Sequence, residues 1–205
     1  KRKGVCEMEN NSAVLDSDTV KVDKYEPHKI ANGKNEVIFF VASDDVDLAD
    51  LQRYRIQAQT DYLIAINGTN KDYDCLKLAD NVISCSPDEV QLVMQAFQLL
   101  HSGSGIIGMD WNEVKWAISS GRNIEFLHGM ASGENCVALA CEQLIPKLKN
   151  LSSNYPITNM MINMYADISF GCEQQDFIIK EIDKNLMVKD ATKFYQLSFF
   201  DEFAD

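Results

Sequence analysis

Apolar residues form three short runs, separated by polar stretches, in the first half of the chain. Residues 37–41 (VIFFV) are continuously apolar, residues 62–66 (YLIAI) form a second run, and residues 82–85 (VISC) form a third. Runs of this length and composition are typical of strands that are buried on both faces of a parallel sheet. They predict the core of an α/β layer.

A helix is expected between the first two strands. Leu48, Leu51, Tyr54 and Ala58 recur at helical spacing, and Asp47 stands where an N-cap residue is preferred. A strand, a helix and a strand in succession predict a right-handed crossover and hence parallel strands. A short linker helix near residues 75–79 precedes the third strand.

The segment that begins at Ser86 carries strong signals for a helix start. Ser86 is a preferred cap, Pro87 suits the first helical position, and Asp88 and Glu89 favour the positive end of the helix dipole. The helix is expected to run to about Leu100. Its residues are apolar on nearly every side, which predicts a long central helix buried between two layers.

The remaining residues predict a second, smaller unit with two main helices. Short and long helices are expected over residues 112–119, 132–149 and 173–183, and strands over residues 157–164 and 192–200. In the last strand Tyr195 and Leu197 alternate with the polar Gln196 and Ser198. Together these elements indicate a small α+β layer.

The predicted fold class is α/β. A polar N-terminal tail covers residues 1–34, although a short strand around residues 20–22 is left open. A truncated, Rossmann-like half of a parallel sheet with the central helix covers residues 35–104, and the α+β domain covers residues 105–205.

Charge and cysteine usage narrow the possible partners. The 205 residues contain 19 Lys plus Arg against 31 Asp plus Glu, a formal net charge of −12. This charge repels phosphate backbones and anionic lipid, so nucleic acid is not an expected partner. No apolar run approaches the ~20 residues of a membrane span, so membrane insertion is not expected either. The six cysteines show no paired metal spacing, and they are expected to be reduced thiols in the cytoplasm. The three histidines lie far apart, so no metal site is expected. No cofactor is expected either.

Two clusters are candidates for function. The first contains Gly108, Asp110, Asn112 and Glu113, whose two acids are three residues apart at a helix start. They could polarise a water molecule, or they could cap the helix, and the spacing favours capping. The second is the glycine-containing stretch 127–135, in which Glu134 would repel a phosphate, so a tight turn is the favoured interpretation.

Three stretches together carry a resemblance to a known family. They read GIIGMDWNEVKWAI, HGMASGENCVALACEQLI and ITNMMINMYADISFGCEQQDFIIKEI. In this order they resemble the C-terminal half of the tubulin/FtsZ superfamily, and the bacterial cell-division member FtsZ most. The resemblance covers roughly residues 35–200. It implies that the second half of the chain is an FtsZ C-terminal-like domain.

The resemblance also implies roles for particular residues. The first stretch resembles the synergy loop, of pattern NxDxxD, which enters the nucleotide site of the neighbouring subunit, where its acids help hydrolyse GTP. Gly108 replaces the Asn of that pattern, Asp110 is kept, and Glu113 replaces the last Asp. Asp88 lies 22 residues before Asp110, in the register of the family's guanine-contacting Asp, and is interpreted as a remnant of that contact.

The phosphate loop of the family is lost. Where the family has a glycine-rich GGGTGTG loop after a strand, this chain has Ser43, Asp44, Asp45, Val46 and Asp47. Glycines allow backbone N–H groups to close on a phosphate, whereas three carboxylates repel it. The sequence therefore predicts a pseudo-GTPase.

Three functions are compatible with these observations. The first is a non-catalytic interaction or assembly module that binds an FtsZ-like protein or itself. The second is a partner that supplies Asp110 and Glu113 to the active site of an FtsZ-like GTPase. The third is a fold reused for an unrelated ligand between the layers.

Overall fold

The computed structural model describes residues 21–69, 71–99, 105–107, 109–167, 169–186 and 190–199. Its first sheet is parallel, with the strand order β1 (Val22–Lys24), β2 (Val37–Val41), β3 (Tyr62–Asn67), β4 (Asn81–Ser84) and β6 (Asn123–Glu125). The second has the order β5 (Gly105–Ile107), β8 (Thr192–Phe199) and β7 (Asn159–Ala166), in which β7 is parallel and β5 antiparallel to β8.

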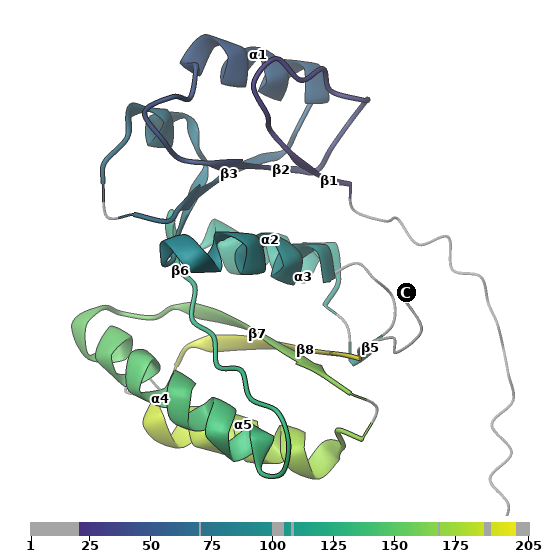
Figure 1. Cartoon of the computed structure of the whole chain (residues 1–205), viewed down its shortest axis with the longest axis vertical. Helices are drawn as coiled ribbons and strands as arrows, with labels where there is room; N and C mark the ends of the chain where they lie inside the picture. Colours follow the sequence, from purple (N-terminus) through teal and green to yellow (C-terminus); the bar gives the residue numbers. More distant parts are fainter. Residues whose placement is uncertain are drawn as a thin grey trace, which may run out of the picture.

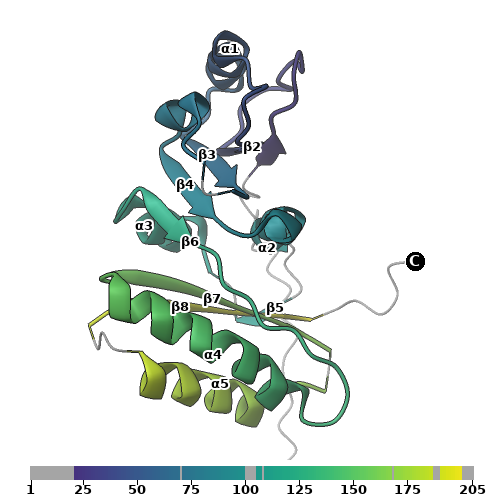
Figure 2. The ribbon, with the colours of Figure 1, turned by 60° about the vertical axis from the view of Figure 1, so that its left-hand side comes forward.

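The two sheets alternate with layers of helices. From top to bottom in Figure 1, α1 covers the first sheet, α2 and α3 lie between the sheets, and α4 and α5 cover the far side of the second sheet. The view in Figure 2 shows the same order of layers. The helices are α1 (Leu48–Ala58), α2 (Val90–Leu99), α3 (Trp111–Ser119), α4 (Cys136–Asn154) and α5 (Cys172–Asn185), with single turns η1 (Asp74–Leu78) and η2 (Pro87–Glu89).

The buried strands point alternate side chains into two cores. Ile38 and Phe40 of β2 face α1, whereas Val37 and Phe39 face α2 and α3. β3 divides its side chains in the same way, because successive residues of a strand point to opposite faces. The α/β class and the strands predicted at 37–41, 62–66 and 82–85 are thereby confirmed, and Asp47 is the N-cap of α1.

The first sheet extends beyond the range 35–104. β1 lies in the stretch predicted as a polar tail, and it pairs with β2 through Val22, Asp23 and Lys24. The side chain of Tyr25 is buried, at 5% exposure, and packs against α1. A three-residue strand is too short to show a periodicity, so only its contacts reveal it. At the other edge, β6 pairs with β4.

The helix after Ser86 differs from the prediction in two ways. It begins as the 3-10 turn η2 and continues as α2, with Ser86 as the N-cap of η2. Among the described side chains of α2, the buried ones lie on one side of the helix: Val93, Met94 and Phe97. Glutamines recur at helical spacing on its opposite side and are exposed: Gln91, Gln95 and Gln98. These glutamines form a polar stripe, so the helix is amphipathic rather than apolar on nearly every side.

One further prediction in the second unit is corrected. α4 begins at Cys136 rather than Ser132, because Gly133 and Asn135 adopt left-handed backbone angles with φ of 81° and 63°. These angles are incompatible with a right-handed helix. In β8 the polar Gln196 and Ser198 are buried, and the Gln196 amide donates to the Ser198 hydroxyl at 3.0 Å.

Candidate functional site

The acidic loop after β2 is held by hydrogen bonds at the start of α1. The Asp47 carboxylate accepts from the backbone N–H groups of Ala49 at 2.9 Å and Asp50 at 3.1 Å. Asp44 forms an ion pair with Lys71, which follows β3. The carbonyl oxygen of Ser43 accepts from the Cys75 thiol at 3.6 Å, and Asp45 is exposed.

Asp88 lies at the same edge of the sheet, after β4. It is exposed in η2, and the hydrogen bond from the Ser86 side chain holds the pKa of its carboxyl below the ordinary value. Because the strands are parallel, the loops after β2 and β4 and the residues after β6 all meet at this carboxyl edge. The acidic loop and Asp88 therefore belong to one end of the sheet.

Asp110 and Glu113 form a reciprocal pair at the start of α3. The backbone N–H of Asp110 donates to the Glu113 carboxylate at 2.9 Å, and the N–H of Glu113 donates to Asp110 at 2.8 Å. This capping box satisfies two donors that the first turn of a helix leaves open. The capping interpretation is confirmed. Asn112 is exposed beside them, and Gly108 lies outside the described residues.

The Asp110–Glu113 pair lies at the opposite end of the first sheet from the acidic loop and Asp88. The ring of Trp111 meets that of Tyr62, the first residue of β3, with centroids 6.1 Å apart. The amide of Asn81, the first residue of β4, donates to the Ile118 carbonyl at 2.8 Å. Both ends of α3 thus contact the amino ends of strands, whereas the acidic loop and Asp88 follow the carboxyl ends. A single chain does not bring the clusters together.

A third cluster was missed by the sequence analysis. Glu89 is buried, and its carboxylate lies 2.7 Å from Nδ1 of His128 and 3.9 Å from Nζ of Lys147. These residues come from η2, from the segment after β6, and from α4. The sequence predicts Glu89 only as an acid that favours the first turn of the helix. Its burial cannot be predicted from neighbouring residues, because His128 and Lys147 are distant in sequence.

Residues 126–132 connect β6 to the turn before α4, and we call them the strap. The predicted tight turn is confined to residues 133–136, where the Cys136 N–H donates to the Gly133 carbonyl oxygen at 3.2 Å. The residues of the strap run from the first sheet along α4 (Figure 2). The amide of Gln143 pairs with the backbone N–H and carbonyl of Met130 at 3.1 and 3.0 Å. Gly129 is pressed so closely against α4 that an added Cβ would lie 2.2 Å from the Ala140 carbonyl oxygen.

A cleft of about 2290 Å³ is lined by residues of the first sheet and of the second unit. Its walls include the strap, Phe97 of α2, residues of β7, and the polar Gln196 and Ser198. Burial raises the pKa of Glu125, whose carboxyl also lines the cleft. The cleft exceeds the roughly 300–1,000 Å³ of a small-molecule pocket, so its size does not favour a single small ligand.

The chain matches no protein-family model and no curated protein sequence. Within the described ranges, no group of three or more His, Cys, Asp or Glu residues is placed to hold a metal ion. Among these residues there is also no helix with the length and apolar character needed to cross a membrane.

Proposed function

We propose that this protein is a non-catalytic, FtsZ/tubulin-like interaction module that binds an FtsZ-like protein in the cytoplasm and neither binds nor hydrolyses GTP. The observation that carries the proposal is the position of the Asp47 carboxylate. It accepts from the backbone N–H groups of Ala49 and Asp50 at the start of α1. These are the donors that a phosphate needs at a helix N-terminus.

Electrostatics supports the same conclusion. A phosphate at the start of α1 would have to displace a bound carboxylate and approach Asp45 and the Asp44–Lys71 ion pair. Like charges a few ångströms apart repel strongly where water is partly excluded. In addition, the described strands of the first sheet follow one another in a single direction. The reversal of strand order that creates a nucleotide crevice in doubly wound folds is not found among them.

The capping box at Asp110 and Glu113 supports binding without catalysis. Each carboxylate is committed to a backbone N–H group, so the pair organises the start of α3. The same pair is exposed at the amino edge of the sheet, where it can contact a partner.

Charge favours an FtsZ-like partner over a second copy of this chain. In the arrangement that the family resemblance implies, the loop with Asp110 and Glu113 of one subunit faces the phosphate loop of the next. Between two copies of this chain, those acids would face Asp44, Asp45 and Asp47. The carboxylates would repel one another, whereas a glycine-rich loop with free N–H groups would accept them.

The proposal is tested by binding measurements on the whole protein. Calorimetric titration with GTP is expected to give no binding, and a micromolar affinity would overturn the pseudo-GTPase assignment. Co-sedimentation with polymers of an FtsZ-like GTPase is expected to capture the protein. Asn112→Arg, at the start of α3, should abolish capture, whereas Ser119→Arg at the exposed end of the same helix should not. Equal capture of both variants would contradict the assigned surface.

A further inference from the structure

Among the described strands, β7 is the longest that lies at the edge of a sheet. The second sheet has the order β5, β8, β7, so β7 is paired on one side only, with β8. The other edge strands, β1, β5 and β6, have three residues each, whereas β7 has eight. A long edge strand presents a row of backbone N–H and C=O groups to which another extended segment can pair.

The backbone groups of Met161 and Asn163 point away from β8. The N–H of Thr192 donates to the Thr158 carbonyl oxygen at 3.0 Å, and the two strands are parallel. In a parallel ladder every second residue of a strand bonds to the same neighbour, so the even-numbered residues of β7 bond to β8 and the odd-numbered ones face outward. In the part of the chain that the structure describes, no backbone hydrogen bond joins Met161 or Asn163 to another segment.

β7 lacks the features that usually protect an edge strand from pairing. Natural edge strands carry charges, prolines or bulges. β1 contains Asp23 and Lys24, and β6 contains Glu125, whereas β7 (NMMINMYA) has neither a charged residue nor a proline. Its register with β8 is continuous. The outer edge of β7 is therefore open to pairing with another chain.

This edge lies along the cleft. All eight residues of β7 line it, together with the strap and the exposed Gln95 and Gln98 of α2. Within the described ranges, the backbone of the strap is hydrogen-bonded to β4 and α4 rather than to β7. An extended chain that pairs with β7 has room between this strand and the strap, where glutamine amides can donate to it and accept from it.

The charges at the carboxyl end of β7 favour a basic occupant. Asp167 directly follows β7, Glu173 is in the first turn of α5, and Glu134 precedes α4, which leads back along β7 (Figure 1). All three acids are exposed and line the cleft. The lysine and the arginine of the lining, Lys71 and Arg122, are held by an aspartate of the acidic loop and by a backbone carbonyl. The acids at this end are thus available to a cationic side chain.

We propose that the edge of β7 binds an extended basic peptide of a partner protein, which adds a strand to the second sheet inside the cleft. Main-chain hydrogen bonds to Met161 and Asn163 supply the pairing, and the acids beside Asp167 select lysine or arginine side chains. A second copy of this chain is disfavoured, because two chains with a formal net charge of −12 repel each other. This inference does not depend on the proposed function.

The test is fluorescence anisotropy of the whole protein with a labelled, end-capped peptide of the length of β7 in which lysine alternates with valine. Saturable binding is expected, and the same peptide with glutamate in place of lysine should bind at least about tenfold more weakly. Residue-resolved hydrogen exchange should show new protection at the N–H groups of Met161 and Asn163. The even-numbered N–H groups already bond to β8 and should change little.

Asn163→Pro and Asn163→Ala are the matched variants. The proline removes an N–H group that β8 does not use, so the fold should be kept while affinity for the lysine peptide falls about tenfold. The alanine keeps the N–H group and should bind like wild type. A lysine peptide that is N-methylated along the edge facing β7 needs no variant, and it should not bind.

Failure of the lysine peptide to bind wild-type protein would overturn the proposal. So would equal binding of the lysine and glutamate peptides, of the N-methylated and unmethylated peptides, or by the proline and alanine variants. Sedimentation measures the remaining alternative. A dimer that dissociates in Asn163→Pro but persists in Asn163→Ala would show that a second copy occupies the edge, and would also contradict the assignment of a basic peptide.

Discussion

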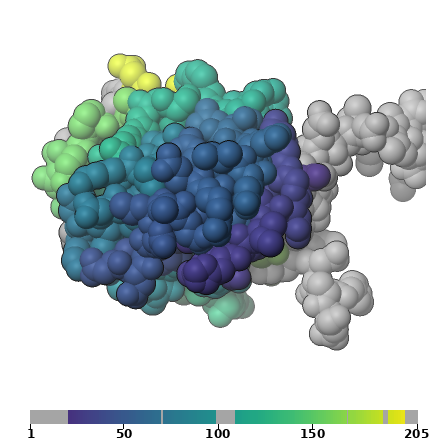
Figure 3. All heavy atoms as spheres, turned by 90° about the horizontal axis from the view of Figure 1, so that it is seen from above, coloured from purple at the N-terminus to yellow at the C-terminus, as the bar shows by residue number. Residues whose placement is uncertain are grey.

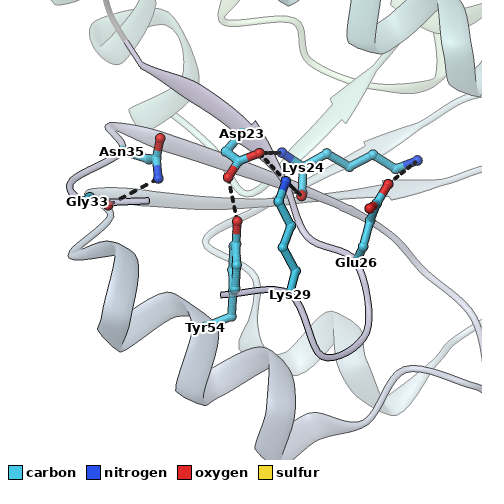
Figure 4. A network of polar contacts seen from close by, with 7 residues as sticks. All are labelled: Asp23, Lys24, Glu26, Lys29, Gly33, Asn35 and Tyr54. Atoms are coloured by element: carbon cyan, nitrogen blue, oxygen red, sulfur yellow. Dashed lines mark hydrogen bonds and ion pairs between the residues drawn. The ribbon is translucent and has the colours of Figure 1, made fainter. Parts of the chain in front are cut away.

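Tyr25 and Tyr54 meet edge to face, with ring centroids 5.6 Å apart, and each donates its hydroxyl to an aspartate on the other's segment. Tyr25, which follows β1, donates to Asp50 of α1 at 2.9 Å, and Tyr54 of α1 donates to Asp23 of β1. Figure 4 shows Tyr54 and Lys29 converging on Asp23. In the space-filling view the purple N-terminal residues lie directly against the blue residues around position 50 (Figure 3).

These crossed hydrogen bonds fasten the N-terminal segment to the first sheet. Tyr54→Phe removes the donor to Asp23 but keeps the ring in the core, so it should lower the free energy of unfolding by about 1–2 kcal/mol. Urea denaturation measures the change. Tyr155→Phe, at a tyrosine that is 64% exposed, is the matched control and should have almost no effect. Equal effects of the two changes would refute the fastening role of Tyr54.

Acid should release the same segment. Burial alone would raise the pKa of the Asp23 carboxyl, but the hydrogen bonds from Lys29 and Tyr54 outweigh it and hold the pKa below the ordinary 3.8. The hydrogen bonds from the His28 N–H and the Tyr25 hydroxyl lower the pKa of the Asp50 carboxyl in the same way. Their contribution to stability is therefore complete above that value and is lost as the pH falls through the lowered pKa. The stability difference between wild type and Asp23→Asn should be complete at pH 6 and should shrink steadily as the pH falls below 3.8. The exposed Asp61→Asn controls for loss of net charge.

Phe97 is the aromatic anchor of α2. Its ring lies 4.9 Å from that of Phe39 and is 7% exposed in the core between α2 and the first sheet. Phe97→Ala should cost about 3–5 kcal/mol in the free energy of unfolding. Gln98→Ala, on the exposed side of the same helix, should change it by less than about 0.5 kcal/mol. A Phe97→Ala protein that melts with the parent would show that α2 is not central to the fold.

Gly129 is required by the close approach of the strap to α4. Gly129→Ala places a methyl group against the Ala140 carbonyl, so the strap must move, at a cost of about 1–3 kcal/mol. Exchange of the strap should rise because the Met130–Gln143 pair is displaced. Gly121→Ala is the control, since an added Cβ there meets nothing within 4 Å. If both alanines were tolerated alike, the strap would not be packed as described.

The sequence predicts elements whose signals are local. The run at 37–41 and the Asp47 cap depend on neighbouring residues only, and both are confirmed. A strand around residues 20–22 was left open, and β1 at Val22–Lys24 could not be predicted firmly because its support comes from Tyr54, about thirty residues away along the chain. The Glu89–His128 contact joins residues 39 positions apart and gives no local pattern.

In the candidate sites, too, contacts between neighbouring residues could be predicted and contacts between distant residues could not. The reciprocal bonds of Asp110 and Glu113 follow from a spacing of three, so their role as caps was predictable. Their position at the opposite end of the sheet from Asp47 depends on the topology, which places α3 against the amino ends of β3 and β4. The roles of Asp88 and of these loops toward a partner stay predictions.

The most direct test of binding without catalysis is GTP turnover by an FtsZ-like partner, measured with wild-type protein and with Asp110→Asn/Glu113→Gln, beside co-sedimentation of both. The double variant keeps capping hydrogen bonds but lacks the carboxylates that could polarise water. We expect both proteins to bind the partner and neither to stimulate turnover. Stimulation by the wild type that falls ~10²–10⁴-fold in the variant, while binding persists, would contradict this account and identify the protein as a GTPase activator.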